Sequence, residues 1–272
     1  MIAALLLFAA VDASRIVTLG GTATETVYAL GAGEHIVGVD KSSLYPPEAT
    51  KKPGVGYVRA FSTEGIISLG PTLVIAVEGA KPEAGLEQLR AVGITVVMLS
   101  GDRSVAGARA RITRVAEVLG VSAQGKALVA RLDAEIVEAS ALVARAKSKP
   151  RVLFIYARGG GTMNVGGVGT AADELIRLAG ATNAVAAFSG YRPLTSESVV
   201  KAAPDAILVT SHGLAGIGGM TALLGVPGIE LTPAVRHDRV VVMDDLLLLG
   251  FGPRVAEAMT TLARKIHPEL TQ

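Results

Sequence analysis

The chain has 272 residues, half of them hydrophobic and 18% charged, which is typical of a globular protein with room for two domains and excludes a disordered chain. The formal net charge is +2 and no block of Lys and Arg occurs, which argues against a nucleic-acid partner, because a basic stripe supplies most of the affinity for phosphates. The absence of cysteine excludes disulfides, thiolate metal sites, iron–sulfur clusters and Cys nucleophiles.

The N-terminal segment predicts export. Residues 1–10 (MIAALLLFAA) form an apolar run with the length of a signal-peptide core, and Val11-Asp12-Ala13 follows as a small-residue cleavage pattern. We expect residues 1–13 to be a signal peptide that lacks its positive start; the alternative is a buried first strand. Without a Cys to carry a lipid, the sequence predicts a periplasmic protein with no membrane anchor.

Apolar runs alternate with helical patterns along the rest of the chain. The predicted strands are 15–19, 35–40, 73–77, 95–100, 151–157, 206–211 and 239–244. The predicted helices are 25–30, 82–92, 104–119, 171–178, 197–202 and 253–266. Most strands are rich in Val, Ile and Leu without alternation, as in strands buried on both faces. This order predicts an α/β protein with mainly parallel sheets.

One helix is longer than the others. Residues 122–147 place apolar side chains on a single face, so they predict a helix roughly 37 Å long at about 1.5 Å per residue. We therefore expect an N-terminal lobe at 14–121, a bridging helix at 122–148 and a C-terminal lobe at 149–272. A stiff connection of this kind predicts small lobe movements on ligand binding.

The two lobes carry related segments. Glu64 ends Gly-Tyr-Val-Arg-Ala-Phe-Ser-Thr-Glu, and Glu197, 133 residues later, ends Gly-Tyr-Arg-Pro-Leu-Thr-Ser-Glu. The same offset places Pro71 on Pro204. The sequence therefore predicts two similar Rossmann-like lobes with a ligand in the cleft between them.

A Gly-rich segment at 159–169 raises an enzymatic alternative. Gly167–Ala172 fits the dinucleotide pattern G-x-G-x-x-A, but residues 183–191 contain no acidic residue for a ribose. We instead expect a flexible loop with Met163 and Asn164 at its tip. A nucleotide-using α/β enzyme stays the alternative from a different class.

The histidines give no metal site. His35, His212, His237 and His267 lack the i, i+4 spacing of a helical site. His35 and His267 are expected at the surface. His212 follows a predicted strand, where open α/β sheets bind ligands, although a loop-capping role is also open.

Tyr57 is the sharper candidate for binding. It lies in a Gly/Pro-rich loop two residues before Arg59. A cation beside a phenol favours the phenolate, and a tyrosinate is a known axial ligand of haem iron. Arg59 also suits a carboxylate such as a haem propionate.

The segment GYVRAFSTEGIISLGPTLVIA resembles the signature of periplasmic haem-binding proteins, the substrate-binding components of bacterial haem ABC importers. The resemblance extends through RIVTLGGTATETVYALG, GTAADELIRLAG, SESVVKAAPDAILV and LLLLGFGPRVAEA. It implies two lobes bridged by one long helix.

The resemblance also implies roles for residues. Tyr57 would ligate ferric haem and Arg59 would tune the phenolate or contact a propionate. Glu64 and Glu197 would dock onto the two subunits of an inner-membrane permease; the alternative is a helix N-terminal residue favoured by the dipole. The second-lobe candidates are Met163, Asn164, Tyr191 and His212.

The resulting hypothesis is a non-enzymatic, monomeric carrier of one or two haems. The runner-up is a carrier of cobalamin or a ferric siderophore, in which Tyr57 would only stack on the ligand.

Overall fold

The computed structural model describes residues 11–158 and 162–270, so most of the predicted signal peptide lies outside the described residues. The chain divides into two compact units. Unit 1 comprises Met1–Asp102 and Ala106–Ala130, and unit 2 comprises Arg103–Val105 and Arg131–Gln272. The exact domain boundaries expected from the sequence stay a prediction.

Unit 1 contains most of the N-terminal half. Its strands are β1 (Ile16–Leu19), β2 (Ile36–Val39), β3 (Gly56–Tyr57), β4 (Ala60–Phe61), β5 (Leu73–Val77) and β6 (Thr95–Leu99). Its helices are α1 (Gly21–Ala29), η1 (Gly33–His35), η2 (Pro47–Lys51), α2 (Thr63–Ser68), α3 (Glu83–Ala91), α4 (Val105–Val118) and the first part of α5 (Ser122–Val143).

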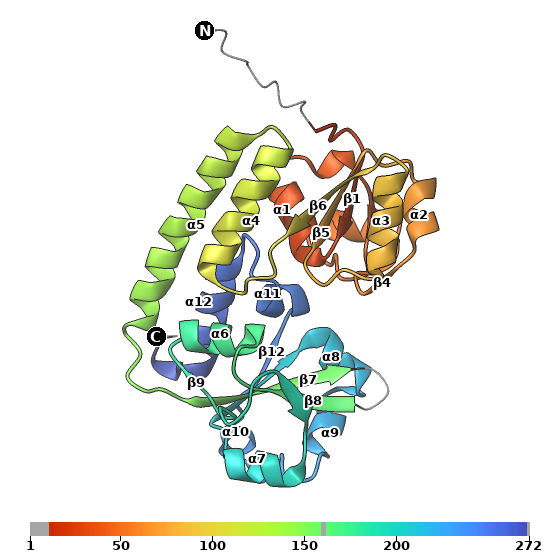
Figure 1. Ribbon diagram of the computed structural model, residues 1–272. Coiled ribbons are helices and arrows are strands. Elements are labelled where there is room, and N and C mark those ends of the chain that lie inside the picture. Colours follow the sequence, from red (N-terminus) through yellow and green to blue (C-terminus); the bar gives the residue numbers. More distant parts are fainter. Residues whose placement is uncertain (1–10, 159–161, 271–272) are drawn as a thin grey trace. The chain divides into compact units, whose positions relative to one another are not determined.

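A parallel sheet in the order β2-β1-β5-β6 forms the centre of unit 1. All four residues of β1 are buried, and so are the first four of β5, which explains why these strands read as continuous apolar runs. Helices α2 and α3 contact each other beside this sheet (Figure 1).

A tight turn joins β1 to α1. Gly20 has φ +113°, and a Cβ there would come within 2.5 Å of Val77 Cγ2. Only glycine combines this backbone conformation with so close a neighbour. The turn brings the start of α1 close to the carboxyl ends of β1 and β5.

Unit 2 contains the other elements. Its strands are β7 (Arg151–Arg158), β8 (Thr162–Gly166), β9 (Thr182–Asn183), β10 (Tyr191–Pro193), β11 (Ala206–Thr210) and β12 (Val240–Met243). Its further helices are α6 (Ala171–Leu178), α7 (Ser196–Ala202), α8 (Ser211–Gly216), α9 (Gly219–Leu224), α10 (Pro233–Arg236), α11 (Asp245–Leu249), α12 (Val255–Ile266) and η3 (Pro268–Leu270).

The sheet of unit 2 has the order β10-β8-β7-β11-β12, with β9 also paired to β7. β7 is parallel to β9 and β11, and β11 is parallel to β12, whereas β8 and β10 are antiparallel to their neighbours. The predicted α/β class with mainly parallel sheets is therefore confirmed.

The prediction of a flexible loop at 159–169, with Met163 and Asn164 at its tip, is wrong at residues 162–166. Thr162–Gly166 is strand β8, which pairs with β7 on one side and β10 on the other. Val165 is 1% exposed and faces Ile155 across the ladder. Burial of this one side chain and pairing on both edges hold the segment as a strand.

The long helix is confirmed. Helix α5 runs for 22 residues from Ser122 in unit 1 to Val143 in unit 2. It ends at Val143, before the predicted last residue, Lys147.

Candidate functional site

Tyr57 lies on a two-stranded hairpin in unit 1. It ends β3, pairs with Ala60 on β4, and precedes the two-residue turn Val58-Arg59. Its side chain is 40% exposed. Within the described residues, its hydroxyl has no hydrogen-bond partner, so the phenol oxygen is open to an external ligand.

Gly56 allows this hairpin to form. Its φ is +98°, and a Cβ would meet the Ala60 carbonyl oxygen at 2.8 Å and Phe61 Cα at 3.1 Å. Any other residue would strain the backbone and push β4 away. The Gly-Tyr pair is thus a structural unit in which the glycine permits the close turn that presents the tyrosine.

The buried carboxylate of Asp40 anchors the turn after Tyr57. Its oxygens accept the backbone N–H of Val58 at 3.0 Å and that of Gly20 at 2.8 Å. They also accept the Ser42 N–H at 3.0 Å and the hydroxyls of Ser42 and Ser43 at 2.8–3.1 Å. Asp40 is 2% exposed. A carboxylate satisfied by so many donors fixes the loops that meet at it.

Backbone bonds on either side of Tyr57 complete the anchoring. The Lys41 N–H donates to the Gly56 carbonyl at 2.8 Å, and the Lys81 N–H donates to the Val58 carbonyl at 2.8 Å. The Val58 side chain is 8% exposed within the hydrophobic cluster of unit 1. Because its neighbours are fixed, the half-exposed tyrosine is presented by a rigid hairpin.

Three cationic residues adjoin the hairpin: Arg59 lies in its turn, and the backbone N–H groups of Lys41 and Lys81 donate to its carbonyls. Lys41, Arg59 and Lys81 are all exposed. Arg59 has no hydrogen bond or ion pair to a described residue. Such cations suit the carboxylates of an anionic ligand; the specific role predicted for Arg59 stays a prediction.

The second-lobe candidates lie on different faces of unit 2. Met163 packs against the core cluster of this unit. Asn164 is the next residue along the strand, so it lies on the opposite face, and it pairs with Tyr156 and Pro193. Tyr191, 45% exposed, places its ring 5.2 Å from the Tyr156 ring. The structure therefore groups Asn164 with Tyr191 and separates Met163 from them.

His212 lies in the first turn of α8. Its Nδ1 is 3.1 Å from Asp245 Oδ2, which also accepts its backbone N–H at 2.9 Å. The residue thus forms part of a local link between α8 and α11. Its imidazole is exposed, and a ligand role for it stays a prediction.

Glu64 and Glu197 occupy equivalent positions. Each is exposed in the first turn of a short helix, α2 or α7. Neither carboxylate has an ion pair or side-chain hydrogen bond to a described residue. Both are therefore available to a partner.

Sequence reasoning misplaced one histidine. His267 is fully buried, and its Nε2 lies 3.0 Å from the Ala179 carbonyl oxygen, so the expectation of a surface residue was wrong. His267 directly follows Ile266, the last residue of α12. No group of three or more His, Cys, Asp or Glu among the described residues is arranged for a metal ion.

The Gly-rich segment before α6 lacks the features of a nucleotide site. It follows the antiparallel strand β8 rather than a parallel one. The acidic side chain of Asp173 accepts the Gly169 N–H at 2.9 Å at the start of the helix. A carboxylate at this position repels the phosphate that a dinucleotide would place there.

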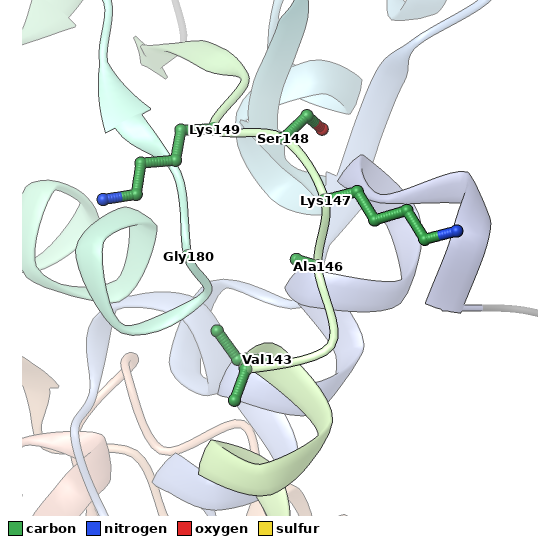
Figure 2. Close-up of a pocket in the computed structure, with 7 residues that line it drawn as sticks. Val143, Ala146, Lys147, Ser148, Lys149 and Gly180 are labelled. Carbon is green, nitrogen blue, oxygen red and sulfur yellow. The ribbon is translucent and has the colours of Figure 1, made fainter.

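A cavity of about 330 Å³ lies in unit 2 where the chain leaves α5. It is lined by Val143, Ala144, Ala146, Lys147, Ser148, Lys149 and Gly180. Figure 2 shows the side chains of Lys147 and Lys149 directed away from each other, so they do not converge on an anion. None of the predicted site residues lines this cavity.

Among the described residues, no helix has the length and apolarity needed to cross a membrane.

Tyr156 and Asp40 are the residues of interest that sequence reasoning missed. The signal for Asp40 was a carboxylate directly after a buried strand.

Residues 16–247 match the periplasmic binding protein family. The chain is 30% identical over 261 residues to an uncharacterised ABC transporter substrate-binding lipoprotein, YvrC of Bacillus subtilis, covering 95% of this chain and 81% of that protein. It is 27% identical to a cobalamin-binding protein of Halobacterium salinarum, covering 94% and 70%.

Solved structures are more similar still. The apo form of the periplasmic haem-binding protein RhuT from Roseiflexus sp. RS-1 has a TM-score of 0.91 at 44% identity, covering 95% of this chain and 99% of that one. The periplasmic haem-binding protein BhuT in complex with two haems has a TM-score of 0.88 at 44% identity, covering 94% and 98%.

Proposed function

We propose that this chain, which belongs to the periplasmic binding protein family, binds ferric haem in the periplasm through Tyr57 and delivers it to an inner-membrane ABC permease. One observation carries the proposal: a half-exposed tyrosine on a rigid hairpin, with no partner for its hydroxyl among the described residues. The similarity to two haem-binding proteins at 44% identity supports the same ligand.

The chemistry of the hairpin fits ferric haem. A phenolate is a hard anionic ligand that suits Fe(III), and a single tyrosine leaves the other axial position to a second group. The exposed cations Lys41, Arg59 and Lys81 suit the two propionates. Reduction of the iron would weaken the bond to the phenolate and loosen the haem.

The role that follows is that of a carrier rather than an enzyme. We expect a monomer that takes up one or two haems. Asn164 and Tyr191 are better second-lobe candidates than Met163, because Met163 packs against the hydrophobic cluster of unit 2 and Tyr191 is 45% exposed on the opposite face of the sheet. Glu64 and Glu197 are then the contacts to the two permease subunits.

Replacement of Tyr57 tests the iron ligand. We expect Tyr57→Phe to lower hemin affinity by at least tenfold and to abolish the high-spin tyrosinate-type spectrum, because the ring stays and only the ligating oxygen is lost. The measurement is a hemin titration followed at the Soret band. Tyr45→Phe is the matched control, since Tyr45 has the same exposed fraction of 40%. Unchanged affinity and spectrum in Tyr57→Phe would exclude this ligand.

Cobalamin is the second candidate ligand, and the relative from Halobacterium salinarum is the observation that favours it. Titration with cyanocobalamin under the same conditions separates the two. Saturable binding of cyanocobalamin together with no binding of hemin would overturn the proposal that the ligand is haem.

A further inference from the structure

We propose that Ile67 and Val200 are apolar contacts to the permease, each one helical turn from a docking glutamate. The inference rests on the permease docking proposed above and adds a second kind of contact to it. Both side chains are aliphatic, and they are 40% and 51% exposed.

The two residues occupy the same position in a repeated structure. Ser62 caps α2 by accepting the Gly65 N–H at 3.0 Å, and Thr195 caps α7 by accepting the Ser198 N–H at 3.1 Å. These caps, the two glutamates and the two aliphatic residues are each related by the offset of 133 residues. An exposed aliphatic residue alone is ordinary, but here it recurs beside the same carboxylate in both units.

The core of each unit does not need these side chains. The preceding residues, Ile66 and Val199, are both 0% exposed and supply the apolar face of their helix. Ile67 and Val200 lie three residues after a glutamate, which places each pair on one side of its helix, about 5–6 Å apart at Cβ. Each unit thus presents a carboxylate and an aliphatic side chain together.

An arginine holds the far end of each of these helices. Arg15 Nε donates to the Gly70 carbonyl at 2.8 Å, and Arg151 Nη2 donates to the Ala202 carbonyl at 2.9 Å. The residue before the next strand contacts the same arginine. The Arg15 backbone N–H donates to the Thr72 hydroxyl, and the Arg151 backbone N–H donates to the Asp205 carboxylate. Both helices are therefore presented rigidly, which limits the entropy lost on docking.

This pattern fits a partner with twofold symmetry. Each subunit would offer a cation to the glutamate and an apolar depression to the neighbouring aliphatic residue. Excluding water beside the ion pair strengthens it, as apolar residues do around charged contacts in protein interfaces. The partner is assigned as the ABC permease because the chain belongs to the periplasmic binding protein family and is similar to an ABC transporter substrate-binding lipoprotein.

The test measures binding of the hemin-loaded protein to the haem permease with its ATPase, reconstituted in lipid nanodiscs. We expect Ile67→Ser and Val200→Ser each to weaken binding by about tenfold, as loss of a partly buried aliphatic contact would. The salt dependence should stay that of the wild type. In Glu64→Gln and Glu197→Gln, by contrast, the salt dependence should fall, because an ion pair is removed.

Val137→Ser is the matched control, since Val137 is an aliphatic residue on α5 that is 68% exposed. Hemin titration and urea unfolding confirm that each variant is folded and loaded. Serine variants that bind like this control overturn the inference, while weakened glutamine variants would still support glutamate docking. Normal binding by the glutamine variants would instead contradict the glutamate part of the proposed function.

Two other occupants of the patch are outcomes of the same experiment. Binding to nanodiscs without permease that depends on Ile67 and Val200 would assign the patch to lipid. Self-association of the wild type that the serine variants lose, measured by analytical ultracentrifugation, would assign it to a second copy of the chain. Either result overturns the permease contact.

Discussion

At the scale of single residues, the haem-ligand candidate depends on groups that do not touch the ligand. Tyr57 carries the open oxygen, but Asp40 and Gly56 determine where it lies. Asp40 holds the Val58 N–H from a position that is 2% exposed, and Gly56 supplies a backbone conformation that L-residues rarely adopt. The tyrosine is thus placed by its supporting residues as much as by its own position in the chain.

Replacement of Gly56 tests this dependence. We expect Gly56→Ala to lower the free energy of unfolding by about 1–3 kcal/mol and to weaken hemin binding, because the strained backbone and the new methyl group displace β4. Urea unfolding and hemin titration measure the two effects. Gly54→Ala is the control, because a Cβ at Gly54 would meet nothing within 4 Å. Equal behaviour of the two variants would refute the proposed role of Gly56.

Sequence reasoning reached Tyr57 but not its supports. A tyrosine followed by Val-Arg in a Gly/Pro-rich loop is visible as a local pattern. Asp40 lies 17 residues earlier in the chain. Three of its five donor groups belong to the nearby Ser42 and Ser43, but the N–H groups of Gly20 and Val58 come from segments 20 and 18 residues away. Contacts between segments distant in sequence leave no local pattern to detect.

At the scale of elements, segments with a continuous apolar run or a helical pattern were predictable, and strands without an apolar run were not. Leu73–Val77 and Ala171–Leu178 have the predicted bounds. The strands β8 and β10, with five and three residues, were missed. Their stability comes from pairing with β7 and with each other, which depends on the fold and not on local propensity.

The structure also reveals a repeat that the sequence comparison of the two lobes missed. Arg15 precedes β1, and Arg151 opens β7. Each contacts the end of the helix that carries Glu64 or Glu197. Their spacing differs from the 133-residue offset of the glutamates, so one sliding comparison does not align both. β1 pairs with β5, the strand after α2, and β7 pairs with β11, the strand after α7. The two arginines are therefore equivalent in the fold.

A C-terminal element gives a test with a pH dependence. Glu269 in η3 accepts the Lys147 N–H at 2.9 Å, and this hydrogen bond lowers the pKa of the Glu269 carboxyl below its ordinary 4.5. A lowered pKa in the folded state contributes stability above the ordinary pKa, and that stability is lost as the pH falls through the lowered value. The contact joins the segment after α5 to the end of the chain.

We expect Glu269→Gln to lower the urea midpoint at pH 7, because a neutral amide accepts this hydrogen bond more weakly than a carboxylate. The difference from the wild type should disappear in buffer below the lowered pKa. Glu138→Gln on the exposed face of α5 is the control. A difference that stays constant between neutral and strongly acidic buffer would contradict an electrostatic origin.

At the scale of the whole molecule, the two units are alike in one respect and different in another. Both present a capped helix with a glutamate and an aliphatic residue, which suits one partner with two equivalent subunits. They differ at the tyrosines: Tyr57 lies on a separate two-stranded hairpin, whereas Tyr191 lies on β10 at the edge of the main sheet. On the proposed roles, the molecule is therefore symmetric for docking and asymmetric for iron binding.

This difference leads to a prediction about the two glutamates together. We expect Glu64→Lys and Glu197→Lys each to weaken permease binding, mainly by slowing association, and the losses in free energy to add in the double variant. Additivity follows because the two residues belong to different units and have no described side-chain partner. Hemin affinity should stay that of the wild type in all three variants, since neither residue lies on the Tyr57 hairpin.

Association kinetics at several salt concentrations measure the loss of permease binding, which should shrink as salt screens exposed charges. Glu138→Lys, an exposed change on α5, controls for net charge. If only one glutamate matters, the permease contacts a single unit and the twofold docking scheme fails; if hemin affinity falls as well, the separation of docking from iron binding fails with it.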